Sequence, residues 1–169
     1  MITCWTVPQP AERLVMQKRI KVLLLLSIIP FFVLPVHAAN IAHDPLIAAL
    51  IHVESGGNDM AIGDRGKGEK AYGALQIRKP CVDDVNRRFG TKYRAEDMLG
   101  NRALSVWVCQ KYFETYAAPK WLGKEPTIED KARIWNGGPA GWKRSATVGY
   151  WAKVKKTMAR NEMLAVAVK

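Results

Sequence analysis

Residues 44–58, DPLIAALIHVESGGN, constrain the fold more than any other stretch, because they predict an apolar helix that carries a single carboxylate at its end. Asp44 is a side chain that caps helices, and Pro45 suits the first helical turn. Gly56 and Gly57 are residues that typically end a helix. We therefore expect a short buried helix that closes just after its carboxylate.

That carboxylate belongs to Glu54, which continues the apolar face of the same helix. Ile47, Leu50, Ile51 and Glu54 fall at the i, i+3, i+4 and i+7 positions, so we expect all four on the buried side. Burial and the negative end of the helix dipole both disfavour an ionised carboxylate. A carboxylic acid that stays protonated near neutral pH can act as a general acid. A lone glutamate at a helix end is more often a surface residue, so this assignment depends on the segments downstream.

The segment before this helix predicts a secretory signal peptide over residues 1–38, followed by one domain over residues 39–169. Three basic residues precede the apolar run 22–34, and Ala38 ends a small-residue cleavage site. The apolar run is short and contains prolines, whereas a membrane-spanning helix needs about 20 apolar residues. We therefore expect an exported, periplasmic or extracellular protein. An uncleaved membrane anchor is the alternative, and Met16 is an alternative start.

The chain is strongly basic, with a formal net charge of +11. It stays basic without the leader, because residues 1–38 hold four of the 26 lysines and arginines and one of the 15 acidic residues. For an exported protein, such a field attracts cell-wall polymers or lipid headgroups rather than nucleic acid. No nucleic-acid motif is recognisable, so we expect no nucleic-acid partner.

The cysteines agree with export. Cys4 falls in the leader, which leaves Cys81 and Cys109 in the domain. Two cysteines in an oxidising compartment predict a disulfide between them. No histidine lies at metal-ligand spacing from either cysteine, so we expect no metal and no cofactor.

The rest of the chain predicts a mainly helical single domain with few strands. Residues 59–70 are rich in glycine and charge, which is typical of a surface loop, and residues 71–77 predict a short strand or a helical turn. Thr127 and Asp130 have the spacing of a capping box. Helical periodicity and helix-ending residues predict four further helices, over residues 83–89, 101–116, 128–136 and 148–163.

Three short motifs follow the first helix in a fixed order: ESGGN at 54–58, GALQI at 73–77 and IWNGG at 134–138, with Tyr150 after them. In this order they resemble the lytic transglycosylase (SLT) domain, whose pattern is ES, G-L-M-Q, A-Y-N-x-G and a tyrosine in the final helix. The resemblance covers residues 40–155. Two apolar pairs depart from the pattern: Ile-Trp replaces Ala-Tyr, and Ala-Leu replaces Leu-Met. These departures affect the fit to a saccharide more than the chemistry.

The resemblance implies a lysozyme-like (α+β) fold and an exported enzyme that acts on peptidoglycan glycan strands. Such an enzyme cleaves the β-1,4 bond between MurNAc and GlcNAc and forms 1,6-anhydroMurNAc. The resemblance implies that Glu54 is the catalytic acid, and that Ser55, Gln76, Asn136 and Tyr150 bind substrate. Wall turnover, an envelope-spanning secretion or conjugation apparatus, and phage lysis are all settings that fit such a domain.

Two other interpretations remain open. A lysozyme-type muramidase of the same fold can use a second carboxylate, for which Asp59 and Asp64 are the nearest candidates. Goose-type lysozymes, which resemble this fold, use acids in the loop after the catalytic helix. We expect Asp64 to be solvated and mobile in its charged loop, and therefore favour the transglycosylase. The third interpretation is a non-catalytic wall-binding envelope protein, and the presence of Glu54, Gln76 and Asn136 together argues against it.

Overall fold

The computed structural model of the protein describes residues 44–64, 66 and 68–167. The predicted signal peptide, with its cleavage site and the alternative start, lies outside the described residues. Among the residues that are described, no helix is both long enough and apolar enough to cross a membrane.

The first described helix, α3 (Pro45–Ser55), forms as the sequence predicts. The Asp44 carboxylate accepts hydrogen bonds from the backbone N–H groups of Leu46 at 2.9 Å and Ile47 at 3.3 Å. Gly56 ends the helix in the left-handed conformation, with φ of 64°. The predicted apolar face is confirmed, because Ile47, Leu50 and Ile51 are buried.

A small antiparallel sheet follows α3, with the strand order β1 (Ile62–Gly63), β2 (Ala71–Tyr72) and β3 (Ile77–Arg78). Ile62 pairs with Tyr72, and Tyr72 pairs with Ile77. The stretch predicted as a loop, 59–70, therefore contains a strand. The stretch 71–77 contributes a strand, a turn and the first residue of β3, where a single strand or a helical turn was expected.

The remaining chain is helical, as predicted, with somewhat different boundaries. The helix expected at 83–89 begins earlier, because Pro80 lies in its first turn instead of ending the segment before it. The capping box of Thr127 and Asp130 is confirmed. The helices are α4 (Lys79–Phe89), α5 (Arg102–Tyr116), α6 (Pro119–Leu122), α7 (Ile128–Gly137) and α8 (Val148–Ala167), with 3-10 turns η2 (Ala95–Met98), η3 (Gly141–Lys143) and η4 (Ser145–Thr147).

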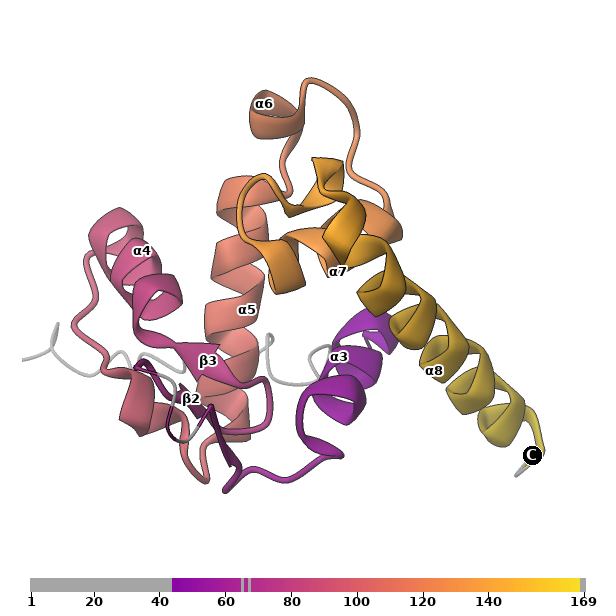
Figure 1. Ribbon diagram of the computed structural model, residues 1–169, viewed down its shortest axis with the longest axis horizontal. Helices are drawn as coiled ribbons and strands as arrows, with labels where there is room; N and C mark the ends of the chain where they lie inside the picture. The colour runs from indigo at the N-terminus through magenta and orange to yellow at the C-terminus, as the bar shows by residue number, and fades with distance from the viewer. Residues whose placement is uncertain (1–43, 65, 67, 168–169) are drawn as a thin grey trace, which may run out of the picture. The chain divides into compact units, whose positions relative to one another are not determined.

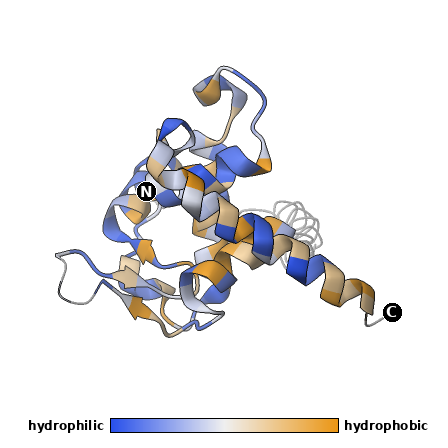
Figure 2. Cartoon of the chain, turned by 45° about the vertical axis from the view of Figure 1, so that its right-hand side comes forward, coloured by the Kyte–Doolittle hydropathy of each residue, from blue (hydrophilic) through white to orange (hydrophobic). Residues whose placement is uncertain are grey.

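Helix α5 separates two groups of elements (Figure 1). The sheet and α4 lie on one side of it, and α3, α7 and α8 lie on the other. Apolar side chains from several of these elements meet in one core, where Leu50, Leu75, Val108, Ile134 and Val154 are fully buried. The far end of α8 extends past the other helices and carries exposed apolar residues, which Figure 2 shows in orange tones. The mainly helical (α+β) architecture predicted from the sequence is confirmed.

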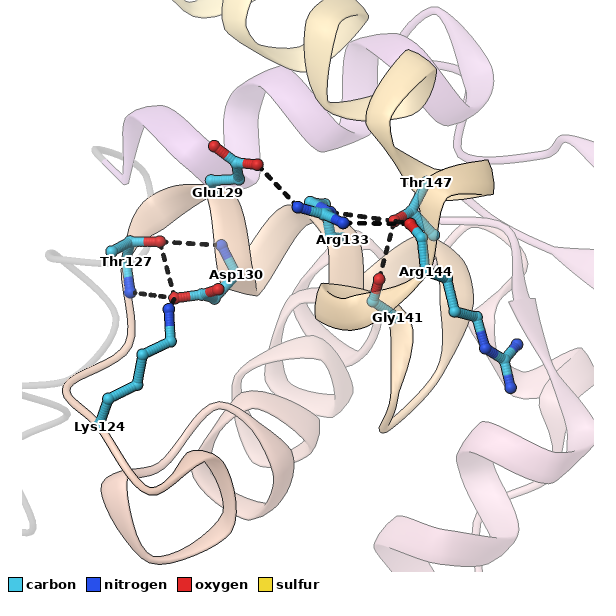
Figure 3. Close-up of polar contacts among 8 residues, drawn as sticks. All are labelled: Lys124, Thr127, Glu129, Asp130, Arg133, Gly141, Arg144 and Thr147. Carbon is cyan, nitrogen blue, oxygen red and sulfur yellow. Dashed lines mark hydrogen bonds and ion pairs between the residues drawn. The ribbon is translucent and has the colours of Figure 1, made fainter.

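A polar network fixes the connection between α7 and α8 (Figure 3). The Arg133 guanidinium donates to the Thr147 hydroxyl at 3.0 Å, to Glu129 at 2.9 Å and to the backbone carbonyl of Arg144 at 3.1 Å. The buried Thr147 hydroxyl lies 2.8 Å from the carbonyl oxygen of Gly141 and can donate to it. Because α7 and α8 both supply residues near Glu54, this network helps to set the geometry around that carboxyl.

Candidate active site

A cleft of about 510 Å³ lies where α3, α5, α7, the start of α4 and the sheet converge. Its polar side chains come from elements far apart in sequence and include Glu54, Asp64, Glu69, Gln76, Arg78 and Asn136. Its apolar surface is provided by side chains that include Ile77, Pro80, Tyr112 and Trp135. The cleft therefore brings together three of the predicted site residues, Glu54, Gln76 and Asn136. Ser55 and Tyr150 do not line it.

Glu54 is half-buried in the last turn of α3, and its side chain reaches the cleft. Burial raises the pKa of Glu54 above its ordinary value. A hydrogen bond from the Tyr150 hydroxyl, 2.6 Å from Glu54 Oε1, opposes this shift because it favours the charged carboxylate. The positive charge of Arg78 lowers the pKa as well, whereas the negative charge of Asp64 raises it. Burial outweighs the contacts that lower the pKa, so the carboxyl is suited to donating a proton.

Asp64 is the second carboxylate of the cleft that influences Glu54. It follows β1 and forms an ion pair with Arg78, the last residue of β3. Its side chain is 24% exposed, against 57% for Arg78, so the carboxylate is partly shielded from solvent and paired with a cation. The expectation of a fully solvated side chain is therefore not met. The sequence could not show this pairing, because the sheet register alone brings the two residues together.

Gln76 occupies the cleft in a constrained conformation. Its φ of 49° and the φ of 53° at Asp64 are the positive values found at non-glycine residues in the described part of the chain. The Gln76 amide nitrogen donates to the backbone carbonyls of Gly73 at 2.9 Å and Ala61 at 3.2 Å. Both amide hydrogens are thereby used within the protein, and the side-chain oxygen lies against Gly63, which also lines the cleft.

The Ser55 side chain also bonds to backbone carbonyls of the protein. Its hydroxyl lies 2.8 Å from the carbonyl oxygen of Ala74 and 3.2 Å from that of Ile51. The first contact ties the end of α3 to the turn between β2 and β3. Ser55 therefore positions the helix that carries Glu54, and does so from outside the cleft.

Asn136 is exposed at the cleft and is free to contact a ligand there. The neighbouring Trp135 and Tyr112 form an edge-to-face aromatic pair, with ring centroids 5.9 Å apart. The sequence motifs did not identify Arg78 or Tyr112 as part of this site. Arg78 follows the GALQI motif directly, and this adjacency is the one sequence signal that points to it.

Cys81 and Cys109 are free thiols in the structure, so the predicted disulfide is not formed. Burial raises the pKa of Cys81 to about 12 and that of Cys109 well above its ordinary value. Cys81 also raises the pKa of Cys109 electrostatically, so the two groups are neighbours. Thiol oxidation proceeds through the thiolate, which burial disfavours at both positions. Within the described residues, no three His, Cys, Asp or Glu side chains are arranged to hold a metal ion.

Comparison with known proteins relates this chain to lysozymes, although no family model matches it. A lysozyme of Meretrix lusoria is 45% identical over 119 residues, which cover 70% of this chain and 93% of that protein. A chain in the crystal structure of Aeromonas hydrophila PliI in complex with Meretrix lusoria lysozyme has a TM-score of 0.58 and 27% identity, covering 69% of this chain and 90% of its own length. Tapes japonica lysozyme has a TM-score of 0.57 at 24% identity, covering 67% of this chain and 88% of its own, which supports the fold alone.

These relatives correct the predicted assignment to the lytic transglycosylases, because they are lysozymes. The short motifs pointed to the wrong family for a structural reason. Ser55 and Gln76 bond to the backbone that supports Glu54, so the motifs describe how an acid is held beside a cleft. They do not specify the group that attacks the sugar. With 45% identity spanning 93% of the Meretrix lusoria protein, the chain belongs to the lysozyme family.

Proposed function

We propose that this protein is a muramidase, which hydrolyses the β-1,4 bond between MurNAc and GlcNAc in peptidoglycan. The observation that supports this most directly is the placement of Glu54 and Asp64 in one cleft, close enough to interact electrostatically. Two carboxyl groups that flank the scissile bond are the usual requirement for glycoside hydrolysis. Membership of the lysozyme family agrees with this reaction.

Glu54 supplies the proton in this proposal. Its buried carboxyl has a raised pKa and stays protonated to higher pH than an ordinary glutamate. It transfers the proton to the glycosidic oxygen as the bond to C1 breaks. The Tyr150 hydroxyl, at 2.6 Å, then stabilises the carboxylate that remains.

Asp64 supplies the negative charge. Its ion pair with Arg78 requires the carboxylate form and orients the side chain at the cleft. A carboxylate in this position stabilises the positive charge that develops at C1, or directs the attack of water. This role replaces the intramolecular attack of the C6 hydroxyl that the transglycosylase interpretation required.

The proposal includes export, because peptidoglycan lies outside the cytoplasmic membrane. The support is the leader pattern of residues 1–38, together with the basic charge of the chain. A secretion or conjugation apparatus gains no support from the comparisons and is not part of the proposal.

Analysis of the reaction products tests this function. Purified peptidoglycan digested with the protein should give muropeptides with reducing MurNAc ends, which borohydride converts to the alcohol. Mass spectrometry separates these from anhydro products, which are one water lighter and are not reduced. Anhydro products, or no release of muropeptides at all, would overturn the proposal.

A further inference from the structure

A second cavity, which we call the side pocket, adjoins the cleft and has a volume of about 490 Å³. Glu69 lines both cavities. Ala71 lines the cleft and Tyr72 lines the side pocket, because successive residues of β2 point to opposite faces of the sheet. The two cavities therefore lie on either side of the sheet and meet at the edge formed by Glu69.

The side pocket is rich in charge of both signs. Its charged side chains are Glu69, Lys70, Lys79, Asp83, Arg94 and Glu96. Lys79 pairs with Asp83 at 2.6 Å, and Arg94 lies 3.5 Å from Glu96. Within the part of the chain that the structure describes, no ion pair involves Lys70 or Glu69, so a cation and an anion are both available to a ligand.

The aromatic side chains of the side pocket are positioned by packing and hydrogen bonds. Tyr93 packs edge-on against Trp107, with ring centroids 5.6 Å apart, and remains 37% exposed. The Asn86 side chain donates to the Tyr93 carbonyl at 2.8 Å and accepts from its N–H at 3.0 Å. On the wall of the side pocket that β2 forms, the Tyr72 hydroxyl donates to Glu96 at 3.4 Å. A pre-formed wall of this kind lowers the entropic cost of binding.

The chemistry of the side pocket differs from what a glycan needs. In a stem-bearing strand, where the stem peptides amidate the lactyl groups, the sugars themselves present hydroxyl and acetamido groups and carry no charge. The stem peptide attached to MurNAc carries free carboxylates, and an amine as well where its third residue is a diamino acid. A pocket with interleaved cations, anions and aromatic faces complements such a peptide.

The stem peptide is long enough to extend away from its sugar. An extended peptide spans roughly 3.4 Å per residue, so a stem of four residues reaches roughly 14 Å from its sugar. Because Glu69 lines both cavities, a MurNAc bound in the cleft can direct its stem past Glu69 toward the side pocket.

We infer that the side pocket binds the stem peptide of peptidoglycan and so makes the protein select peptide-bearing glycan. Lys70 would contact its carboxylates, Glu69 its amine, and Tyr93 its apolar side chains. This inference rests on the proposed muramidase function, since the glycan bound in the cleft delivers the stem.

The test compares cleavage of intact peptidoglycan strands with cleavage of the same strands stripped of stem peptides by an amidase. The variant Lys70→Ala removes the lysine of the side pocket that forms no ion pair with a described residue. The matched control, Lys92→Ala, removes the same charge from an exposed position that lines neither cavity. The pocket variant should lose at least about fivefold in kcat/KM on intact strands and keep its activity on stripped strands. The control should keep both activities.

An equal loss on both substrates, or no loss on either, would overturn the role of the side pocket while leaving the muramidase assignment intact. Failure of the wild-type protein to cleave either substrate would instead count against the muramidase assignment. Binding of a free stem tetrapeptide to the uncleaving Glu54→Gln protein, followed by NMR, tests the side pocket without any catalysis. Saturable shifts at the amides of Tyr93 and Lys79 are expected, and the absence of shifts at millimolar peptide contradicts the inference.

Discussion

The Tyr150 hydroxyl donates a hydrogen bond of 2.6 Å to Glu54 Oε1 across a sequence separation of 96 residues. The contact joins the last helix, α8, to the first described helix, α3, and these two helices pack against each other. It favours the ionised form of Glu54, while burial favours the neutral form. The pKa of Glu54 is therefore set by two opposing effects, and one of them can be removed by a single substitution.

The substitution Tyr150→Phe should move the alkaline limb of the activity profile to higher pH. Activity requires protonated Glu54 and falls as pH rises through its pKa. Loss of a hydrogen bond to the carboxylate raises that pKa further, so the protonated form persists to higher pH. The measurement is kcat/KM against pH. Tyr116→Phe is the matched control, because the Tyr116 hydroxyl bonds to Asp84 instead, at 3.0 Å. A limb that stays in place would contradict the proposed control of Glu54.

The substitution Glu54→Gln should reduce wall cleavage by roughly 10²–10⁴-fold, because it removes the transferable proton and keeps the shape of the side chain. Release of soluble muropeptides is the readout, and near-normal activity would remove Glu54 from the mechanism.

The same variant should also unfold at higher temperature than the wild type at pH 8. The pKa of Glu54 is raised in the folded state from the ordinary value of 4.5, so the folded state binds more protons than the unfolded state between the two pKa values. Stability contributed by Glu54 is therefore lost as pH rises through that window. Thermal unfolding at pH 4 and pH 8 should show the advantage of Gln only at the higher pH. An equal difference at both pH values would contradict the raised pKa.

The substitution Asp64→Asn should abolish most hydrolysis, with a loss on the order of 10²-fold or more in kcat, if this carboxylate stabilises the charge at C1. Asp59→Asn is the control, because Asp59 lies in the same loop region but pairs with Arg102 at 2.8 Å and does not line the cleft. Turnover within a few-fold of the wild type for Asp64→Asn would leave Glu54 without the proposed partner.

Cys81 and Cys109 should react slowly with a thiol reagent in the folded protein and fully after unfolding. Burial raises the pKa of Cys81 to about 12 and protects Cys109 from solvent, so little thiolate is available at neutral pH. Thiol titration in native buffer and in denaturant measures both states. Two thiols that remain unreactive in denaturant until a reductant is added would restore the disulfide predicted from the sequence.

Two glycines near the junction of α7 and α8 should respond oppositely to alanine. A Cβ at Gly141 would lie 2.0 Å from the backbone oxygen of Arg133, so Gly141→Ala should destabilise by at least about 1–3 kcal/mol. Gly149 has open space around it and lies in α8, so Gly149→Ala should be neutral or stabilise by up to about 1 kcal/mol. Chemical denaturation measures both free energies. Destabilisation of similar size in both variants would contradict the close contact at Gly141.

The sequence by itself determined the local elements. Asp44, Pro45 and Gly56 act on α3 through hydrogen bonds and backbone angles within a few residues, and the capping box at Thr127 works at the same range. The helical face of Ile47, Leu50 and Ile51 follows from a fixed periodicity. These features were predictable because each depends on neighbours in the chain. The position of Glu54 at the end of a buried face was predictable for the same reason.

Only the tertiary structure decided what surrounds that carboxyl. The pairing of Asp64 with Arg78 depends on the register of a three-stranded sheet, and the contact of Tyr150 with Glu54 depends on the packing of α8 against α3. Ser55 and Gln76 were predicted to bind substrate, yet their polar groups bond to backbone atoms that come near only after folding. Choosing between a hydrolase and a transglycosylase requires knowing which second group faces the sugar, and that group is placed by contacts between distant segments.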